Sequence, residues 1–129
     1  MFYIYDCANL CILNNIFQET LQWNALEHLI FAYGTLKEAK VRRGLLRRHV
    51  AAENDTLLGF AIEWIYLDGN LYPVAVNDPL NRNMIPGKVF RVNSFEIGII
   101  DEYESVAYKR IKAVLESGRL AWLYVKPWN

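Results

Sequence analysis

The chain has 129 residues, enough for one domain with a substantial core, and 53% of them are apolar. Fourteen basic residues balance fourteen acidic ones, so the whole molecule lacks the positive charge typical of proteins that bind nucleic acid or membrane surfaces. No apolar run approaches the ~20 residues that a membrane span requires, and no secretory signal is apparent. We therefore predict a cytoplasmic protein with neither nucleic acid nor membrane as a partner.

Few residues are suited to metal binding. Cysteine occurs only at Cys7 and Cys11, and histidine only at His28 and His49. A metal site would need further ligands beside the two cysteines. We interpret the cysteines as reduced thiols and the histidines as structural or surface residues, and we predict no metal and no other cofactor.

Residues 1–28 are predicted to form an N-terminal extension that is mostly helical. Met1–Tyr5 is compatible with a short strand. Apolar residues then recur at spacings of three and four, as on one face of a helix: Leu10, Leu13, Phe17 and Leu21. Three interpretations stay open. The helix packs on the main domain, or it packs on a second subunit and forms a homodimer, or the segment is foreign to the domain.

The main domain is predicted to span residues 29–129 and to begin with a strand over Leu29–Tyr33. Gly34 then indicates a tight turn with a positive φ or a close backbone approach, and a helix follows from Lys37. A junction of strand, turn and helix leaves backbone N–H groups without partners. The N–H groups of residues 34–36 therefore form a candidate cradle for an anion.

The segment from Lys37 to Val50 is predicted to be a basic helix. It carries six basic residues: Lys37, Lys40, Arg42, Arg43, Arg47 and Arg48. Val41, Leu45 and Leu46 give it an apolar side, and Gly44 interrupts it. We interpret the basic residues as a solvent-exposed face. Nucleic-acid binding is the alternative, but no aromatic residue lies between the arginines to stack on bases.

Strands dominate the remainder of the chain. Glu53–Asp55 is interpreted as a polar break, followed by a long strand over Thr56–Leu67 in which Gly59 indicates a bend or a bulge. The later elements are a turn at Asp68–Asn70, a strand over Leu71–Val76 with Pro73 at an edge or bulge, a loop over Asn77–Gly87, a strand over Lys88–Val92, a helix capped by Ser94 and running through Phe95–Glu104, and strands over Ala107–Leu115 and Leu120–Val125. This order predicts an α+β fold that forms a small β-barrel.

The helix after Ser94 carries the strongest catalytic candidate. Four of its residues lie three or four positions apart and share one face: Ile97, Ile100, Asp101 and Glu104. The isoleucines indicate that this face is buried. Burial would raise the pKa of Glu104 and suit it to acid–base catalysis near neutral pH. The alternative is that Glu104 lies at the rim of the buried face and pairs with Lys109 or Arg110. No serine or cysteine lies in a nucleophile-elbow sequence.

Seven short motifs occur in order between residues 29 and 126: Tyr33-Gly34-Thr35-Leu36, Gly59-Phe60, Tyr72-Pro73, Gly87-Lys88-Val89-Phe90-Arg91-Val92, Ile100-Asp101-Glu102-Tyr103-Glu104, Tyr108-Lys109-Arg110 and Ala121-Trp122-Leu123-Tyr124. Together they resemble the γ-glutamylcyclotransferase-like family, also called AIG2-like. The resemblance implies a small mixed β-barrel flanked by helices. It also implies cleavage of a γ-glutamyl amine or dipeptide, in which the α-amine of the substrate attacks its own γ-carbonyl and releases 5-oxoproline and a free amine.

The resemblance implies a role for each part of the site, with a small γ-glutamyl molecule as the partner and no cofactor. Glu104 would be the general base on the α-ammonium and then the acid to the leaving amine. The N–H groups of Gly34, Thr35 and Leu36 would hold the glutamyl group, by its carboxylate or by the developing oxyanion.

Supporting residues and departures from the family pattern complete the prediction. Tyr124 is a candidate hydrogen-bond donor, Tyr33 a candidate substrate contact or a packing residue, and Asp101 a candidate for orienting Glu104 or capping backbone. Ser105 stands where the motif commonly has glycine, and residues 37–40 lack the usual early glycine. The alternative function is a non-catalytic ligand-binding or protein-interaction module on the same fold.

Overall fold

The computed structural model describes residues 27–80 and 82–127. The expectations for residues 1–26, which include the N-terminal strand, the helix, the homodimer contact and the two cysteines, lie outside the described residues. The strands are β1 (Glu27–Ala32), β2 (Ala52–Leu58), β3 (Phe60–Leu67), β4 (Asn70–Asn77), β5 (Met84–Asn93), β6 (Lys109–Val114) and β7 (Leu120–Val125). The α-helices are α2 (Ala39–Leu46) and α3 (Ser94–Glu104), and the 3-10 helices are η1 (Thr35–Lys37) and η2 (Ser105–Ala107).

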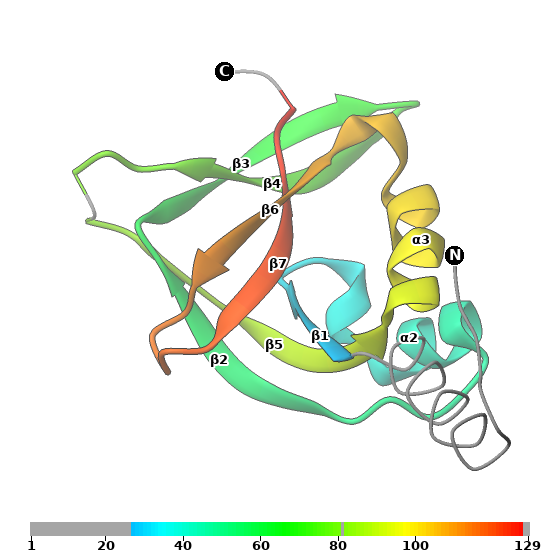
Figure 1. Cartoon of the computed structure of the whole chain (residues 1–129). Helices are drawn as coiled ribbons and strands as arrows, with labels where there is room; N and C mark the ends of the chain where they lie inside the picture. The colour runs from blue at the N-terminus through cyan, green and yellow to red at the C-terminus, as the bar shows by residue number, and fades with distance from the viewer. Residues whose placement is uncertain (1–26, 81, 128–129) are drawn as a thin grey trace, which may run out of the picture.

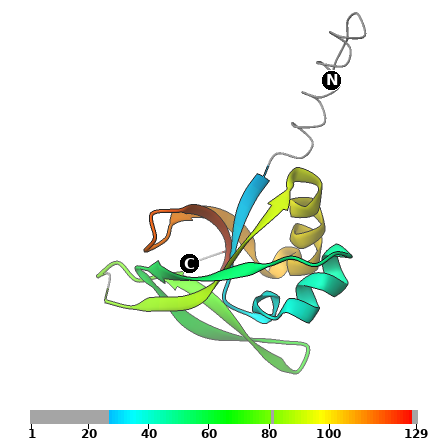
Figure 2. The same ribbon diagram turned by 90° about the horizontal axis from the view of Figure 1, so that it is seen from below.

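The strands form one mixed sheet in the order β2-β5-β1-β7-β4-β3, with β6 paired to β7. The central strand β1 is antiparallel to β5 and parallel to β7. Figures 1 and 2 show that the sheet curls into a partly open barrel, with α2 and α3 together on one flank. The predicted α+β fold, a mixed β-barrel flanked by helices, is confirmed. None of the helices in the described part of the chain has the length and apolar character needed to cross a membrane.

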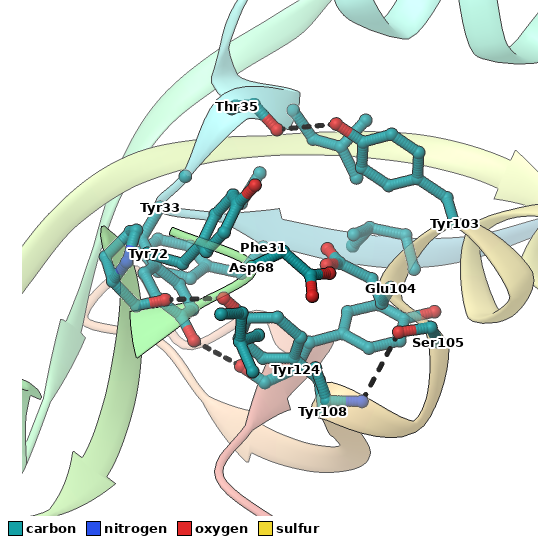
Figure 3. Close-up of a pocket in the computed structure, with 17 residues that line it drawn as sticks. Phe31, Tyr33, Thr35, Asp68, Tyr72, Tyr103, Glu104, Ser105, Tyr108 and Tyr124 are labelled. Atoms are coloured by element: carbon teal, nitrogen blue, oxygen red, sulfur yellow. Dashed lines mark hydrogen bonds between the residues drawn. The ribbon is translucent and has the colours of Figure 1, made fainter. Parts of the chain in front are cut away.

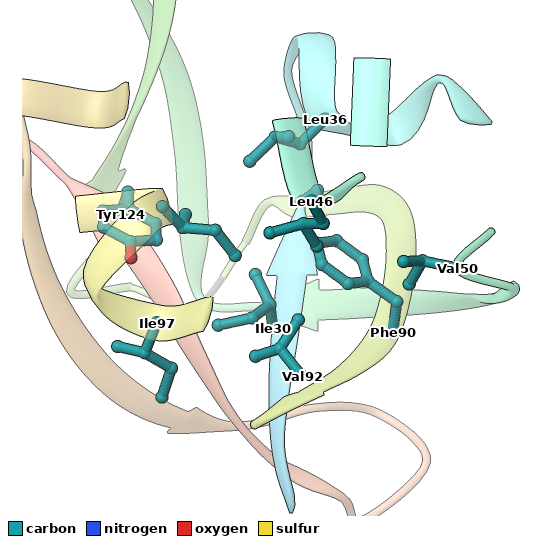
Figure 4. Close-up of a cluster of buried hydrophobic side chains, with 10 residues drawn as sticks. Ile30, Leu36, Leu46, Val50, Phe90, Val92, Ile97 and Tyr124 are labelled. Carbon is teal, nitrogen blue, oxygen red and sulfur yellow. The ribbon is translucent and has the colours of Figure 1, made fainter. Parts of the chain in front are cut away.

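Strand β1 lies between two apolar cores because its successive side chains point to opposite faces. Ile30 packs with Phe90, Ile97 and Ile100 beneath the helices, as Figure 4 shows for this cluster. Phe31 packs on the other side, inside the curl of the sheet, with the cluster that contains Leu57 and Leu123. Both β1 side chains are fully buried. The strand that ends at the predicted cradle is therefore fixed on both faces.

Two predicted boundaries on the edge of the sheet are wrong. Glu53–Asp55 is part of β2 and pairs with β5, because the acidic side chains have partners in Arg119 and Ser117. The predicted strand Thr56–Leu67 is two strands, separated at Gly59 by a φ of 79°, a conformation that glycine adopts readily.

Strand β5 and helix α3 also differ from the prediction. β5 begins at Met84, so it includes part of the predicted loop, and Gly87 has room only for hydrogen because a Cβ there would lie 2.6 Å from Cζ of Phe31. Asn93, and not Ser94, is the N-cap of α3. Its side chain accepts from the Glu96 N–H at 2.8 Å, and the Glu96 carboxylate accepts from the Asn93 N–H at 3.0 Å.

The predicted hairpin turn at residues 68–70 is confirmed. Asp68 and Gly69 have φ angles of 49° and 83°, which matches the tight turn that joins two antiparallel strands. β3 and β4 pair from Phe60↔Asn77 to Leu67↔Asn70. The turn consequently places Asp68 at the end of this hairpin, and Figure 1 shows that this end of the hairpin lies near the C-terminal end of α3.

Candidate functional site

A cavity of about 340 Å³ lies where four parts of the fold meet. Its walls come from the end of β1 and η1 (residues 30–36), the turn of the β3–β4 hairpin with the start of β4, the C-terminal end of α3 with η2, and β7. Figure 3 shows the side chains that point into it. The predicted residues Tyr33, Gly34, Thr35, Leu36, Glu104 and Tyr124 all line this one cavity.

Glu104 is the last residue of α3, and its side chain points into the cavity (Figure 3). The preceding residues Ile97 and Ile100 are buried, so this face of the helix is turned toward the core, as predicted. Burial raises the pKa of Glu104 to about 7. Arg110 binds Asp101 at 3.0 Å, and the carboxylate of Glu104 makes no hydrogen bond or ion pair with any described residue. The alternative, in which Glu104 forms an ion pair with Lys109 or Arg110, is therefore wrong.

The turn after β1 lines the cavity with residues 34–36. Within this turn, the N–H groups of Lys37 and Glu38 donate hydrogen bonds to the carbonyls of Gly34 and Thr35, at 3.1 and 3.0 Å. Within the described chain, the N–H groups of Gly34, Thr35 and Leu36 donate no hydrogen bond. The predicted reason for a glycine at position 34, a positive φ or a close backbone approach, is wrong. The φ of Gly34 is −112°, and an added Cβ would meet only Pro73, at 3.8 Å. Neither a positive φ nor crowding requires glycine there.

Arg42 holds this turn from behind, and sequence reasoning missed it. It is 4% exposed, and its guanidinium donates to the carbonyls of Leu36 at 3.0 Å, Lys37 at 2.7 Å and Val50 at 3.1 Å. The prediction that Arg42 belongs to an exposed basic face is wrong, because α2 directs it toward η1. Its spacing of three and four from Leu45 and Leu46 places it on the apolar side of the helix and would have been the signal.

Asp101 lies behind the cavity wall and binds Tyr124 and Arg110. The hydroxyl of Tyr124 donates to Oδ1 of Asp101 at 2.6 Å, and Arg110 donates to both carboxylate oxygens at 3.0 and 3.1 Å. No described hydrogen bond joins Asp101 to Glu104. Asp101 therefore positions Tyr124, and it lies outside the cavity lining. Burial and the Asp101 carboxylate raise the pKa of Tyr124, so its proton stays on the hydroxyl.

Tyr33 joins two strands at the base of the cavity. Its hydroxyl accepts from the backbone N–H of Ala75 at 2.8 Å and donates to the backbone carbonyl of Tyr124. β4 and β7 pair directly at Ala75↔Val125, so the tyrosine extends this parallel contact. Burial raises the pKa of Tyr33. The hydroxyl has both a donor and an acceptor in the protein, which favours the packing interpretation over direct contact with a substrate.

Among the further residues that line the cavity, four have a carboxyl or phenol side chain and were not predicted as site residues: Asp68, Tyr72, Tyr103 and Tyr108. Tyr108 donates to the carbonyl of Pro73 at 2.8 Å, and burial raises its pKa to about 12. Tyr103 shares a hydrogen bond of 2.7 Å with Thr35 and so links α3 to η1 across the cavity. Tyr72 and Tyr108 had a signal in the sequence, their places in the Tyr-Pro and Tyr-x-Arg motifs.

Ser105 adopts a backbone conformation that only glycine occupies readily. Its φ is 59° and its ψ is −163°, a strain of about 1–3 kcal/mol for other residues. The conformation turns the chain directly after Glu104, where the family pattern commonly has glycine. The strained turn gives a physical reason for that pattern.

We expect Ser105→Gly to raise the free energy of unfolding by about 1 kcal/mol, because relief of strain exceeds the greater chain entropy of glycine. Urea denaturation would measure this change. Ser105→Ala is the matched control, because it keeps the strain and removes only the hydrogen bond of 3.3 Å from the Ala107 N–H to Oγ. A less stable glycine variant would show that the turn is not strained.

A family model described as "Gamma-glutamyl cyclotransferase, AIG2-like" matches residues 30–129. AIG2-like protein D of Arabidopsis thaliana is 33% identical over 84 residues, which are 64% of this chain and 53% of that protein. The chain therefore spans about half the length of this curated relative.

Solved structures also resemble the fold of this chain. The solution structure of At5g39720.1 from Arabidopsis thaliana has a TM-score of 0.66 at 27% identity, over 78% of this chain and 69% of that chain. A structure described as gamma-glutamyl cyclotransferase has a TM-score of 0.65 at 16% identity, over 78% of this chain and 66% of that chain, and this likeness concerns the fold. With a family model that matches most of its length, the chain belongs to the gamma-glutamyl cyclotransferase, AIG2-like family.

Proposed function

We propose that the protein is a γ-glutamyl cyclotransferase that cleaves a γ-glutamyl amide and releases 5-oxoproline and a free amine. One observation carries the proposal: the half-buried carboxylate of Glu104, which makes no described hydrogen bond or ion pair, borders the same cavity as residues 34–36, whose backbone N–H groups donate no hydrogen bond within the described chain. Family membership supports it.

The reaction needs one proton acceptor and a fixed geometry. Glu104 takes a proton from the α-ammonium of the substrate, and the freed amine nitrogen attacks the γ-carbonyl carbon. The carbonyl oxygen becomes an oxyanion, which re-forms the carbonyl as the bond from the γ-carbon to the leaving nitrogen breaks and the proton on Glu104 passes to that nitrogen. The second proton of the attacking nitrogen then passes through the ionised Glu104 to the released amine, which leaves as an ammonium. Nucleophile and electrophile both belong to the substrate, so the protein mainly aligns them, an effect that can lower the barrier by several kcal/mol. A pKa near neutrality lets one carboxylate serve as base and then as acid.

The walls of the cavity suit the two ends of a glutamyl group. The N–H groups of Gly34, Thr35 and Leu36 are donors for its α-carboxylate or for the oxyanion. The hydroxyl oxygen of Tyr124, whose proton goes to Asp101, has lone pairs that can accept from the α-ammonium. Tyr124 thus serves as an acceptor, where the sequence suggested a donor.

A panel of γ-glutamyl amines and γ-glutamyl dipeptides, with 5-oxoproline measured as the product, tests the proposal. We expect catalytic release of 5-oxoproline from at least one member. Binding of the panel without turnover would favour the ligand-binding alternative. Release of glutamate in place of 5-oxoproline would mean that water, and not the α-amine, is the nucleophile.

A further inference from the structure

We propose that Asp68 is a specificity-determining residue that selects a γ-glutamyl substrate whose leaving amine carries a positive charge. This inference rests on the proposed function and concerns the part of the cavity that holds the leaving group. Asp68 lines the cavity from the β3–β4 hairpin turn, and Figure 3 shows its side chain pointing into the same space as that of Glu104.

The charged groups of the cavity are all acidic. Glu104 and Asp68 line it, whereas no lysine, arginine or histidine of the described residues does. The nearby arginine, Arg110, is held behind the wall by Asp101. Within residues 27–80 and 82–127, the carboxylate of Asp68 makes no hydrogen bond or ion pair. A leaving group with a carboxylate of its own would therefore meet repulsion, and an ammonium group would find a free partner.

The uncharged side chains of the cavity also favour a cation. Six aromatic residues line it: Phe31, Tyr33, Tyr72, Tyr103, Tyr108 and Tyr124. Aromatic faces attract ammonium groups through the ring quadrupole. Two of the tyrosines, Tyr108 and Tyr124, donate their hydroxyl protons to the protein, to Pro73 O and Asp101. Their oxygens therefore present lone pairs, and the walls around Glu104 and Asp68 are rich in acceptors.

The charge pattern matches a substrate with two ammonium groups. The α-ammonium of the glutamyl group is assigned to Glu104, which leaves Asp68 for a second ammonium on the departing amine. The α-carboxylate of the glutamyl group is assigned to the backbone N–H groups of residues 34–36. Each charge of a γ-glutamyl diamine then has an opposite partner in the cavity.

Three γ-glutamyl amides with four-carbon leaving groups test this inference: those of 1,4-diaminobutane, butylamine and 4-aminobutyrate, which carry a cationic, a neutral and an anionic tail. For the wild type we expect kcat/KM to fall in that order, with the cationic amide roughly fivefold above the neutral one, the size typical of a solvent-exposed ion pair. Added salt should reduce this ratio.

Asp68→Asn is the informative variant because asparagine, like aspartate, tolerates the left-handed conformation that the turn requires at φ 49°. It should abolish the preference for the cationic amide, because kcat/KM for that amide falls and kcat/KM for the anionic amide rises toward that of the neutral one. Glu116→Gln, which removes an exposed carboxylate outside this cavity, is the control and should keep the preference.

Turnover that shows no dependence on tail charge, or that Asp68→Asn lowers equally for all three amides, would overturn the inference and leave the proposed function standing. Calorimetric binding of the amides to Glu104→Gln, with and without Asp68→Asn, supplies a readout without turnover. Binding that depends on tail charge and on Asp68, in a protein without cyclotransferase activity, would support recognition by Asp68 and overturn the proposed function. Binding and turnover that are both absent would overturn both.

Discussion

Replacing Glu104 with glutamine should lower kcat/KM for release of 5-oxoproline by about 10²–10⁴-fold, the range typical of a lost general acid–base. Glutamine keeps the size and polarity of the side chain but cannot take the proton of the α-ammonium. Most of the loss should appear in kcat, because the N–H groups of residues 34–36 still bind the glutamyl group. Steady-state kinetics with the best substrate of the panel would measure it.

The control for this experiment is Glu102→Gln, on the same helix. Glu102 is exposed and does not line the cavity, so its replacement should leave the activity unchanged. Equal activity of Glu104→Gln and the wild type would refute the assigned mechanism.

The stability of Glu104→Gln should separate a catalytic loss from a folding defect. The pKa of Glu104 is raised from 4.5 to about 7 in the fold, so the folded state binds this proton more tightly than the unfolded state. Stability contributed by this group therefore falls as the pH rises from 4.5 toward 7. Glutamine removes that loss, and the variant should be at least as stable as the wild type at pH 8. If Glu104→Gln were less stable than the wild type at pH 8, its lost activity would be explained by a folding defect and not by the loss of a catalytic group.

Replacing Arg42 with methionine should destabilise the protein by about 3 kcal/mol or more. Methionine fills similar space but leaves the carbonyls of Leu36, Lys37 and Val50 without their donor, and an unsatisfied buried acceptor costs about 1–3 kcal/mol. The turn that carries the N–H groups of residues 34–36 would also lose its support. At temperatures where the variant stays folded, we therefore expect a higher KM for γ-glutamyl substrates. Urea denaturation and steady-state kinetics would measure the two effects.

Arg43→Met is the matched control for this prediction. Arg43 is the next residue of α2 and is exposed, so its replacement removes the same charge without opening buried hydrogen bonds. Comparable stability of the two variants would mean that Arg42 does not support the turn.

The elements that could be predicted from the sequence are those specified by local patterns. The apolar run before Gly34, the Asp68-Gly69 turn, the isoleucine spacing in α3 and the apolar final strand each depend on residues that are close in the chain. The family motifs then linked Glu104 to the turn at residues 34–36. The structure places both on one cavity, although the sequence alone gives no distance between them.

Other features depend on contacts between distant segments and could not be derived from local patterns. β2 includes Glu53 and Asp55 because Arg119, from the β6–β7 connection, forms ion pairs with both carboxylates, and Ser117 of the same connection donates a hydrogen bond to Asp55. Asp68 reaches the cavity only because the β3–β4 hairpin ends beside α3. Arg42 is buried because the chain after β1 turns back onto α2, which brings three carbonyls within its reach.

The pH dependence of kcat/KM for the wild type tests the assignment of Glu104 most directly. A carboxylate that acts as base must be ionised in the free enzyme, and burial in the cavity wall sets its pKa to about 7. The rate should therefore rise about tenfold per pH unit on the acid side and level off above a midpoint near 7. The residual activity of Glu104→Gln should lack this limb. A midpoint near the ordinary glutamate value of 4.5, or the same limb in Glu104→Gln, would contradict a half-buried Glu104 as the general base.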